Sequence, residues 1–285
     1  FGDDGCTWLV ALPDLINQAS HRWGLTNVQP VSNLSYNFVA FAKRLNEDVV
    51  LKIGVPNSEL VSEISALRFF DGKGAVRLLE ADEERAMFLL ERLRPGEMLA
   101  TLSDDDHATH IAADVMLRLW HTPPKNIPFI KLTDWFNELN KLRPAFNGGT
   151  GPFPKKLIEE VEETLPRLFV ESELPMLIHG DLHHYNILSS GDNWLAIDPK
   201  GVIGHPEYEV GPFLINPFPN FLNGSQPKVQ IEKRIAIFSE RLGFPRQRLR
   251  DWGMCHAVLS AWWNMAPDGT GGEYSMHCAE IISQT

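Results

Sequence analysis

His179-Gly180-Asp181-Leu182-His183-His184-Tyr185-Asn186 is the stretch that decides the fold, and Asp198 follows it twelve residues after Asn186. Moving a phosphoryl group from ATP to a hydroxyl needs a carboxylate that orients the hydroxyl and accepts its proton. It also needs oxygen ligands that hold Mg²⁺ against the phosphates. Asp181, Asn186 and Asp198 supply such a set. The stretch therefore predicts a phosphoryl-transfer site that uses ATP and Mg²⁺.

The segments on either side of these residues are short and apolar. Residues 175–178 and 194–197 are bounded by turn-forming residues, which is typical of buried strand ends. Asp181 and Asn186 would then share one loop, and Asp198 would enter the same cleft from the next strand. Loops fixed by a rigid scaffold commonly carry the functional side chains of enzymes.

Length and composition favour a folded enzyme. The chain has 285 residues, of which 44% are hydrophobic and 22% charged, ordinary values for a globular protein with a substantial core. The formal net charge is −11, because 26 Lys and Arg oppose 37 Asp and Glu. This balance argues against a nucleic-acid partner. It suits a small cationic substrate, although an acidic surface also serves solubility.

The sequence contains no signal for secretion or for a membrane. Its three cysteines are widely spaced and form no Cys-x-x-Cys motif, which fits a reducing cytoplasm. The longest apolar stretches fall far below the roughly 18 residues that span a bilayer. Residues 1–16 lack the basic segment of a secretory signal. We expect a cytoplasmic monomer without nucleic-acid or membrane partners.

The N-terminal third has the pattern of a small sheet with one helix. Residues 38–42 and 49–53 are apolar and flank a turn-like segment, which indicates a hairpin. Apolar residues then recur at helical spacing as far as the glycine-rich turn 71–74. Two further apolar runs, 76–79 and 87–90, would complete the sheet.

Pro95-Gly96 breaks this pattern, and the sequence that follows is mostly helical. We predict an α+β fold with a nucleotide-binding lobe at residues 1–93 and a catalytic and substrate-binding lobe at residues 94–285. The second lobe should contain helices at about 103–121, 131–145, 155–170, 227–243, 246–265 and 271–283. Three tryptophans would fill its core or form an aromatic wall for the substrate: Trp252, Trp262 and Trp263.

Lys52 lies within the apolar run 49–53, where an unpaired ammonium would carry a heavy desolvation penalty. It should therefore have anionic partners. We expect it to contact the ATP phosphates, with Glu63 of the following helix holding its side chain as part of the catalytic machinery. Glu59, one turn earlier on the same helical face, is the alternative to Glu63.

Other contacts to the nucleotide are expected before and after Lys52. Residues 31–37 lack the glycines of a phosphate-covering loop, so backbone amides and nearby side chains would serve instead: Ser32, Ser35 or Asn37. The segment Glu91-Arg92-Leu93 follows the last apolar run of the sheet and would offer backbone hydrogen bonds to adenine. Glu91 and Leu93 are accordingly candidates for the ATP site.

Charged residues near the motif are candidates for binding the acceptor. Lys200 would neutralise charge on the phosphoryl group during transfer. Glu207 and Glu209 would line an acidic pocket, or else cap the next helix. Asp268, in a glycine-rich segment near the C-terminus, is a further acidic candidate. Asp181 itself would meet the acceptor hydroxyl.

The histidines around Asp181 permit a second interpretation, a metal-dependent hydrolase, because imidazole and carboxylate are good transition-metal ligands. Such a site needs neither an Asn five residues after the Asp nor a lysine on an upstream strand. Phosphoryl transfer uses both, so it is favoured. The histidines would then orient or pack the loop.

Taken together, these residues resemble the aminoglycoside phosphotransferases, most closely the branch of streptomycin 6-phosphotransferases and hydroxyurea kinases. The resemblance covers most of the chain from about Val49 and rests on residues 74–79, 179–188, 194–201 and 259–264. It implies a two-lobed protein-kinase-like fold with ATP between the lobes. It also implies Asp181 as the catalytic base and Asn186 with Asp198 as ligands of Mg²⁺.

The resemblance further implies a hydroxylated, cationic antibiotic as the acceptor. The leading hypothesis is an ATP- and Mg²⁺-dependent O-phosphotransferase that acts on a streptomycin-like aminoglycoside and confers resistance. One alternative is a small-molecule kinase acting on hydroxyurea or a metabolite alcohol. Another is an inactive, nucleotide-binding regulator, against which the presence of Lys52, Asp181, Asn186 and Asp198 argues.

Overall fold

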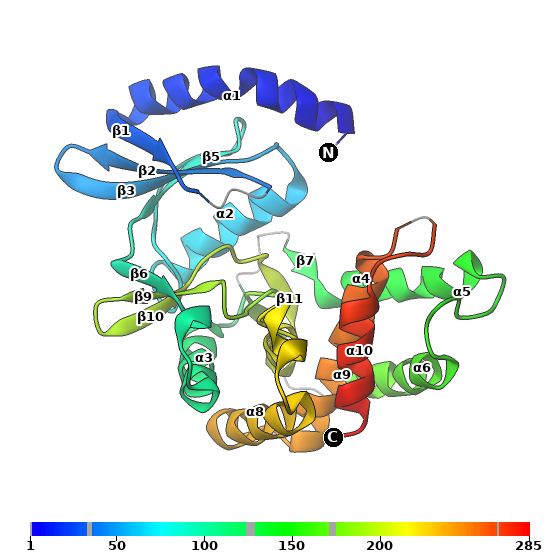
Figure 1. Ribbon diagram of the computed structural model, residues 1–285. Coiled ribbons are helices and arrows are strands. Elements are labelled where there is room, and N and C mark those ends of the chain that lie inside the picture. Colours follow the sequence, from blue (N-terminus) through cyan, green and yellow to red (C-terminus); the bar gives the residue numbers. More distant parts are fainter. Residues whose placement is uncertain (1, 33–35, 124–128, 171–174, 267) are drawn as a thin grey trace.

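The computed structural model of the chain (Figure 1) describes residues 2–32, 36–123, 129–170, 175–266 and 268–285. Its helices are α1 (Gly2–Trp23), α2 (Ser58–Phe70), α3 (Asp105–Leu119), α4 (Leu132–Asn137), α5 (Leu142–Ala145), α6 (Lys155–Val170), α7 (Val210–Leu214), α8 (Pro227–Leu242), α9 (Arg246–Trp263) and α10 (Glu273–Ser283). Its strands are β1 (Leu25–Pro30), β2 (Phe38–Arg44), β3 (Glu47–Ile53), β4 (Leu78–Asp82), β5 (Met87–Glu91), β6 (Pro95–Met98), β7 (Ile130–Lys131), β8 (Met176–Ile178), β9 (Ile187–Ser190), β10 (Asn193–Ala196) and β11 (Val202–Gly204). The expected α+β class is confirmed.

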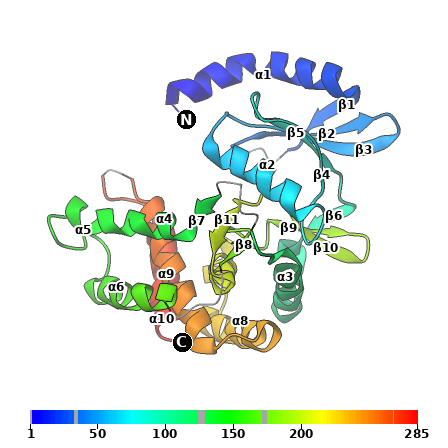
Figure 2. The ribbon, with the colours of Figure 1, turned by 180° about the vertical axis from the view of Figure 1, so that it is seen from behind.

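The N-terminal part is an antiparallel five-stranded sheet in the order β1-β2-β3-β5-β4. Helix α1 lies across one face and α2 lies against the other, as Figure 2 shows from behind. Because side chains alternate along a strand, β3 divides its residues between the two faces. Val49, Leu51 and Ile53 pack in the cluster under α1, while Val50 and Lys52 point to the opposite side. The hairpin predicted from the sequence thus corresponds to β2 and β3.

Helix α2 begins at a side-chain cap and ends at the glycine-rich turn that the sequence predicted. The Asn57 side chain accepts a hydrogen bond from the Leu60 N–H at 2.8 Å, which satisfies one free donor of the first turn. At the other end, Asp71 adopts a left-handed conformation (φ 46°) and its N–H bonds to the Leu67 carbonyl. The helix therefore has a defined register against the sheet, and that register sets the position of Glu63.

The chain changes sheets between β5 and β6, because β6 pairs with β9 in the small sheet β10-β9-β6. A third sheet, β7-β11-β8, lies nearby, and helices α3 to α10 surround both (Figure 1). The loop from β8 to β9 and the loop from β10 to β11 carry the motif residues. One hydrophobic core runs from α2 into these helices, so both loops rest on packed structure.

Several elements differ from the sequence-based expectation. Helix α1 and strands β1 and β6 were not expected, and the run at 131–145 is divided into α4, a 3₁₀ turn at Glu138–Lys141 and α5. Pro144, within α5, has no N–H with which to continue α-helical bonding back to residue 140, which accounts for the 3₁₀ turn before α5. Among the described residues, no helix combines the length and the apolar character needed to cross a membrane.

Candidate active site

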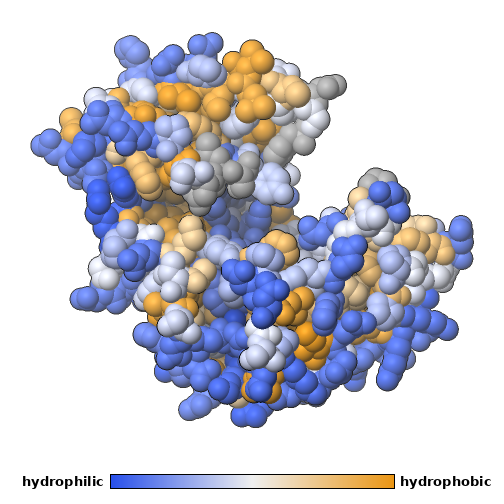
Figure 3. Space-filling model, in the orientation of Figure 1, coloured by the Kyte–Doolittle hydropathy of each residue, from blue (hydrophilic) through white to orange (hydrophobic). Residues whose placement is uncertain are grey.

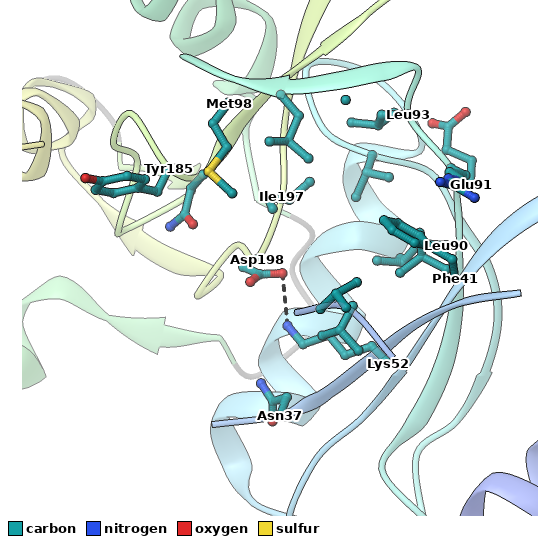
Figure 4. A pocket seen from close by; sticks show the side chains of 18 of the residues that line it. Asn37, Phe41, Lys52, Leu90, Glu91, Leu93, Met98, Tyr185, Ile197 and Asp198 are labelled. Atoms are coloured by element: carbon teal, nitrogen blue, oxygen red, sulfur yellow. Dashed lines mark hydrogen bonds and ion pairs between the residues drawn. The ribbon is translucent and has the colours of Figure 1, made fainter. Parts of the chain in front are cut away.

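A cavity of about 450 Å³ lies between the five-stranded sheet and strands β6 and β9 (Figure 4). Its walls are apolar above and below, formed by Val39, Phe41, Val50, Leu90, Met98, Leu188 and Ile197. One end is polar, where Lys52 and Asp198 face each other. A flat apolar slot with a charged end has the shape and chemistry to hold a planar base beside its phosphates.

The connector after β5 forms one wall of this cavity. The Glu91 carboxylate accepts the Arg77 backbone N–H at 2.8 Å, and the Arg92 guanidinium lies 3.7 Å from the centre of the Phe41 ring. The side chain of Glu91 is therefore engaged, and residues Glu91 to Leu93 all line the cavity. The structure thus brings both predicted connector residues to the slot, where main-chain groups would make the contacts.

Lys52 is almost fully buried and has two carboxylate partners. Its Nζ lies 2.6 Å from Glu63 Oε1 and 3.0 Å from Asp198 Oδ1. Burial alone would lower the pKa of Lys52, but the charges of Asp198 and Glu63 raise the pKa above its ordinary value. The same ammonium outweighs the effect of burial on Asp198 and lowers the pKa of that carboxyl. Lys52 and Asp198 are thus held as opposite charges at the polar end of the slot.

The alternative partner, Glu59, lies elsewhere. Its Oε2 is exposed and 3.6 Å from Lys200 Nζ, whereas Glu63 is buried on the face of α2 that meets β3. Of the two helix glutamates that the sequence left open, the geometry selects Glu63 as the partner of Lys52.

A second cavity, of about 740 Å³, adjoins the first at Lys52, Asn186 and Asp198. Asp181 and Lys200 line it as well. Residues from β3, the β8–β9 loop and the β10–β11 loop therefore meet around one space, although up to 146 positions of sequence separate them.

The β8–β9 loop is held in shape by Asn186. Its Nδ2 donates to the Asp181 carbonyl at 2.9 Å, which closes the loop upon itself. Within the described part of the chain, Asn186 Oδ1 has no hydrogen-bond donor, so this oxygen remains available to a cation. The Asp181 side chain is about 39% exposed and lines the second cavity.

His179 connects this loop with the segment that carries Asp198. Its Nδ1 accepts the Asp181 backbone N–H at 3.2 Å, so Nε2 carries the proton and donates to the Ile197 carbonyl at 2.8 Å. Burial lowers the pKa of His179 to about 4, and the ring is therefore neutral. Both ring nitrogens are engaged with protein groups, which fits an orienting role and leaves neither for a metal.

Glu209 is a residue whose part in the site the sequence analysis missed. It belongs to a 3₁₀ turn, Pro206–Glu209, and its buried carboxylate accepts the backbone N–H groups of His179 at 2.7 Å and Gly180 at 2.8 Å. Burial raises the pKa of Glu209 to about 7. One carboxylate thus binds both backbone N–H groups that precede Asp181 and fixes the position of that segment. Only the folded chain brings these residues together, so no local sequence signal reveals the contact.

The donor set fits a magnesium ion. Asp198 offers carboxylate oxygens and Asn186 an amide oxygen, the hard ligands that Mg²⁺ prefers. Mg²⁺ bound to a nucleotide commonly takes one or two protein ligands and completes its shell with phosphate oxygens and water. Across the described residues, no group of three or more His, Cys, Asp or Glu is placed to hold a metal without such help.

Two candidates from the sequence do not join the others, and a third, Ser35, lies outside the described residues. Glu207 was expected to line an acidic pocket or to cap the next helix, but its buried side chain does neither: its Oε1 lies 2.7 Å from Arg248 Nε, away from both cavities. Asp268 is exposed and accepts hydrogen bonds from its own turn, at Thr270 N and Oγ1. For Glu207 and Asp268 the structure gives local packing and turn formation in place of the expected cavity lining.

Comparison with known proteins gives the family of the chain. The family model of aminoglycoside/hydroxyurea antibiotic resistance kinases matches residues 22–269. A streptomycin 6-kinase of Streptomyces glaucescens is 30% identical over 269 residues, which cover 93% of this chain and 87% of that protein. A hydroxyurea phosphotransferase of Kitasatospora aureofaciens is 28% identical and covers 93% of this chain and 76% of its own length.

Among solved structures, a thermostable mutant of the aminoglycoside phosphotransferase APH(4)-Ia, in ternary complex with ADP and hygromycin B, is similar in fold. The TM-score is 0.64 at 14% sequence identity, and the match covers 94% of this chain and 97% of the other. The fold is protein-kinase-like, as the sequence motifs imply.

Proposed function

The chain belongs to the family of aminoglycoside/hydroxyurea antibiotic resistance kinases, and from this membership we propose that it transfers the γ-phosphoryl group of ATP to a hydroxyl of a streptomycin-like aminoglycoside. The transfer depends on Mg²⁺ and takes place in the cytoplasm, where ATP is supplied. Residues 1–93 form the nucleotide-binding lobe and residues 94–285 the catalytic and substrate-binding lobe.

One observation carries the proposal: Lys52, Asp181, Asn186 and Asp198 converge on two adjoining cavities from separate parts of the chain. The apolar slot takes the adenine, and its polar end takes the phosphates. Lys52 neutralises phosphate charge there, and Glu63 keeps its ammonium in place. A Mg²⁺ ion held by Asn186 and Asp198 would neutralise charge on the phosphate oxygens during transfer.

Asp181 acts on the acceptor side. Its carboxylate orients the acceptor hydroxyl and accepts the proton as the new O–P bond forms. Positioning dominates phosphoryl transfer, because the protein takes little part in covalent chemistry. His179 and Glu209 serve that purpose, since they fix the peptide on which Asp181 lies. Lys200 lines the second cavity and neutralises negative charge on the phosphoryl group during its transfer.

The family and the charge of the chain support an aminoglycoside as the acceptor. A net charge of −11 attracts a polycation over a distance and raises its local concentration near an acidic cleft. Relatives named as streptomycin 6-kinases support the 6-hydroxyl as the site of transfer. Hydroxyurea is the second candidate acceptor, because one relative is a hydroxyurea phosphotransferase.

An acceptor panel with product identification tests the proposal. Purified protein, ATP and Mg²⁺ are incubated with streptomycin, other aminoglycosides, hydroxyurea and small amino alcohols, and mass spectrometry locates any added phosphoryl group. We expect a monophosphorylated streptomycin with the group on the 6-hydroxyl and none with the Asp181→Asn variant. If hydroxyurea were phosphorylated and no aminoglycoside were, hydroxyurea would be the acceptor. No phosphorylated product from any acceptor would refute both.

A further inference from the structure

Trp263 is unusual among the tryptophans of α9 because its ring is about 45% exposed. Trp252, eleven residues earlier and close to the same helical face, is completely buried. Burying a tryptophan is strongly favourable, so a half-exposed one at the end of a core helix has a free surface for another molecule. Trp263 is the last residue of α9, and α4 lies beside this helix on the side of the molecule that borders the hollow in Figure 3.

The exposed ring is held in place by a second tryptophan. Trp263 and Trp135 form a perpendicular pair with ring centres 5.3 Å apart. Trp135 in turn contacts Tyr208, which packs on the buried Trp252. A ring anchored through such a chain of contacts has little rotamer freedom left to lose when a ligand binds. In an edge-to-face pair, at least one face of each ring stays uncovered by its partner.

This pair adjoins the catalytic loop. A Cβ atom built on Gly180 would lie 2.9 Å from Cη2 of Trp135, so the indole touches the backbone of the residue before Asp181. Gly180 has φ +90°, a conformation that suits glycine, and the close approach of Trp135 gives a second reason for glycine there. Trp135 therefore lies against the backbone next to Asp181, and Trp263 packs on the far side of Trp135.

The proposed acceptor supplies a cation suited to the exposed ring. A guanidinium group is planar and weakly hydrated, and it stacks readily on an indole face. The ring of streptomycin that bears the 6-hydroxyl carries guanidinium groups.

From this arrangement we infer that Trp263, supported by Trp135, is a specificity-determining residue that stacks on a guanidinium group of the acceptor. The inference rests on the proposed function, because it takes an aminoglycoside as the molecule presented to Asp181. It narrows the acceptor class to aminoglycosides in which a guanidinium lies close to the reacting hydroxyl.

Two substitutions at one position separate stacking on a π face from simple apolar contact. Trp263→Phe keeps an aromatic face, and Trp263→Leu keeps apolar bulk without one. We expect Trp263→Leu to raise the KM for streptomycin about tenfold and Trp263→Phe about threefold or less, with kcat and the KM for ATP nearly unchanged. Because the ring is half-exposed, both variants should keep the wild-type melting temperature within a few degrees.

A KM for streptomycin that is unchanged in Trp263→Leu would overturn the inference, and so would equal increases in the two variants. With an aminoglycoside that carries ammonium groups but no guanidinium, Trp263→Leu should raise the KM for that substrate only about twofold. A tenfold increase with such a substrate would also contradict stacking on a guanidinium group. Failure of the proposed function has a different signature, namely wild-type protein that phosphorylates no aminoglycoside at all.

Discussion

Replacing Glu209 with glutamine tests how the protein fixes its catalytic loop. The glutamine has nearly the same shape but one acceptor oxygen, and its NH₂ group would face a backbone donor. One of the two N–H groups that the carboxylate binds, at His179 or Gly180, would lose its partner. Hydrogen bonds to a charged group contribute about 1.5–3 kcal/mol each. A loss of this size in the alignment of Asp181 corresponds to a decrease in kcat of about 10- to 100-fold.

The pKa of Glu209 makes the same change visible in the pH dependence. Because burial raises this pKa from 4.5 to about 7, the wild-type carboxyl ionises near pH 7, and only the ionised form accepts both N–H groups fully. We expect the wild-type kcat to rise through about pH 7. In Glu209→Gln, kcat should no longer rise through pH 7. Glu207→Gln, in the same turn but paired with Arg248, is the matched control, and its kcat should still rise through pH 7.

Stability should respond in the opposite direction to activity. A carboxyl whose pKa is raised on folding favours the folded state below pH 4.5, and this contribution is lost as the pH rises through about 7. The interval of about 2.5 pH units corresponds to roughly 3 kcal/mol. The free energy of unfolding is measured with urea at pH 5 and at pH 8. Between these two pH values the wild-type free energy of unfolding should fall by about that amount, and the free energy of unfolding of Glu209→Gln should show no such fall from this group. Equal changes in the two proteins, together with a kcat that still rises through pH 7 in Glu209→Gln, would refute the reasoning.

Three further substitutions address the remaining parts of the site. Asp181→Asn should lower kcat by about 10³-fold or more with little change in the KM for ATP, measured by coupled ADP release; a kcat within tenfold of wild type would exclude a base at this position. Lys52→Met leaves the carboxylates of Glu63 and Asp198 without their shared cation. It should raise the KM for ATP, lower kcat, and destabilise the fold by about 3–5 kcal/mol in urea unfolding, and unchanged values would contradict the assigned ion pairs. Asn186→Ala should raise the Mg²⁺ concentration for half-maximal activity about tenfold, and EDTA should abolish turnover of the wild type; activity that survives EDTA would exclude the metal.

Contacts encoded within short segments were predictable from the sequence. The loop that holds Asp181 and Asn186 is contiguous, so the spacing of its functional residues can be read directly along the chain. Helix α2 carries its own cap at Asn57, and the alternation along β3 places Lys52 on one face. These features depend on periodicity and local hydrogen bonding, both of which a linear pattern expresses.

Contacts that depend on tertiary packing were not predictable. Glu207 and Glu209 lie two positions apart, yet one pairs with Arg248 and the other clamps the peptide before Asp181. The turn that contains them decides which side chain points to the loop, and no local pattern distinguishes the two.

Helix α1 is a different case. Its buried face carries apolar residues at helical spacing, at positions 8, 12, 15, 16, 19 and 23. This signal was present in the sequence but interrupted by Pro13, which ordinarily argues against a continuous helix. Packing against the five-stranded sheet supplies the stabilisation that local propensity lacks.

The most direct test of the central claim is the initial rate of ADP formation by the wild-type protein with ATP and Mg²⁺, measured with and without streptomycin. The arrangement of Lys52, Asp181, Asn186 and Asp198 predicts ADP formation that depends on the acceptor and matches phosphorylated product one to one. ADP formation that is no faster with streptomycin, or with any other aminoglycoside, than without an acceptor would contradict it.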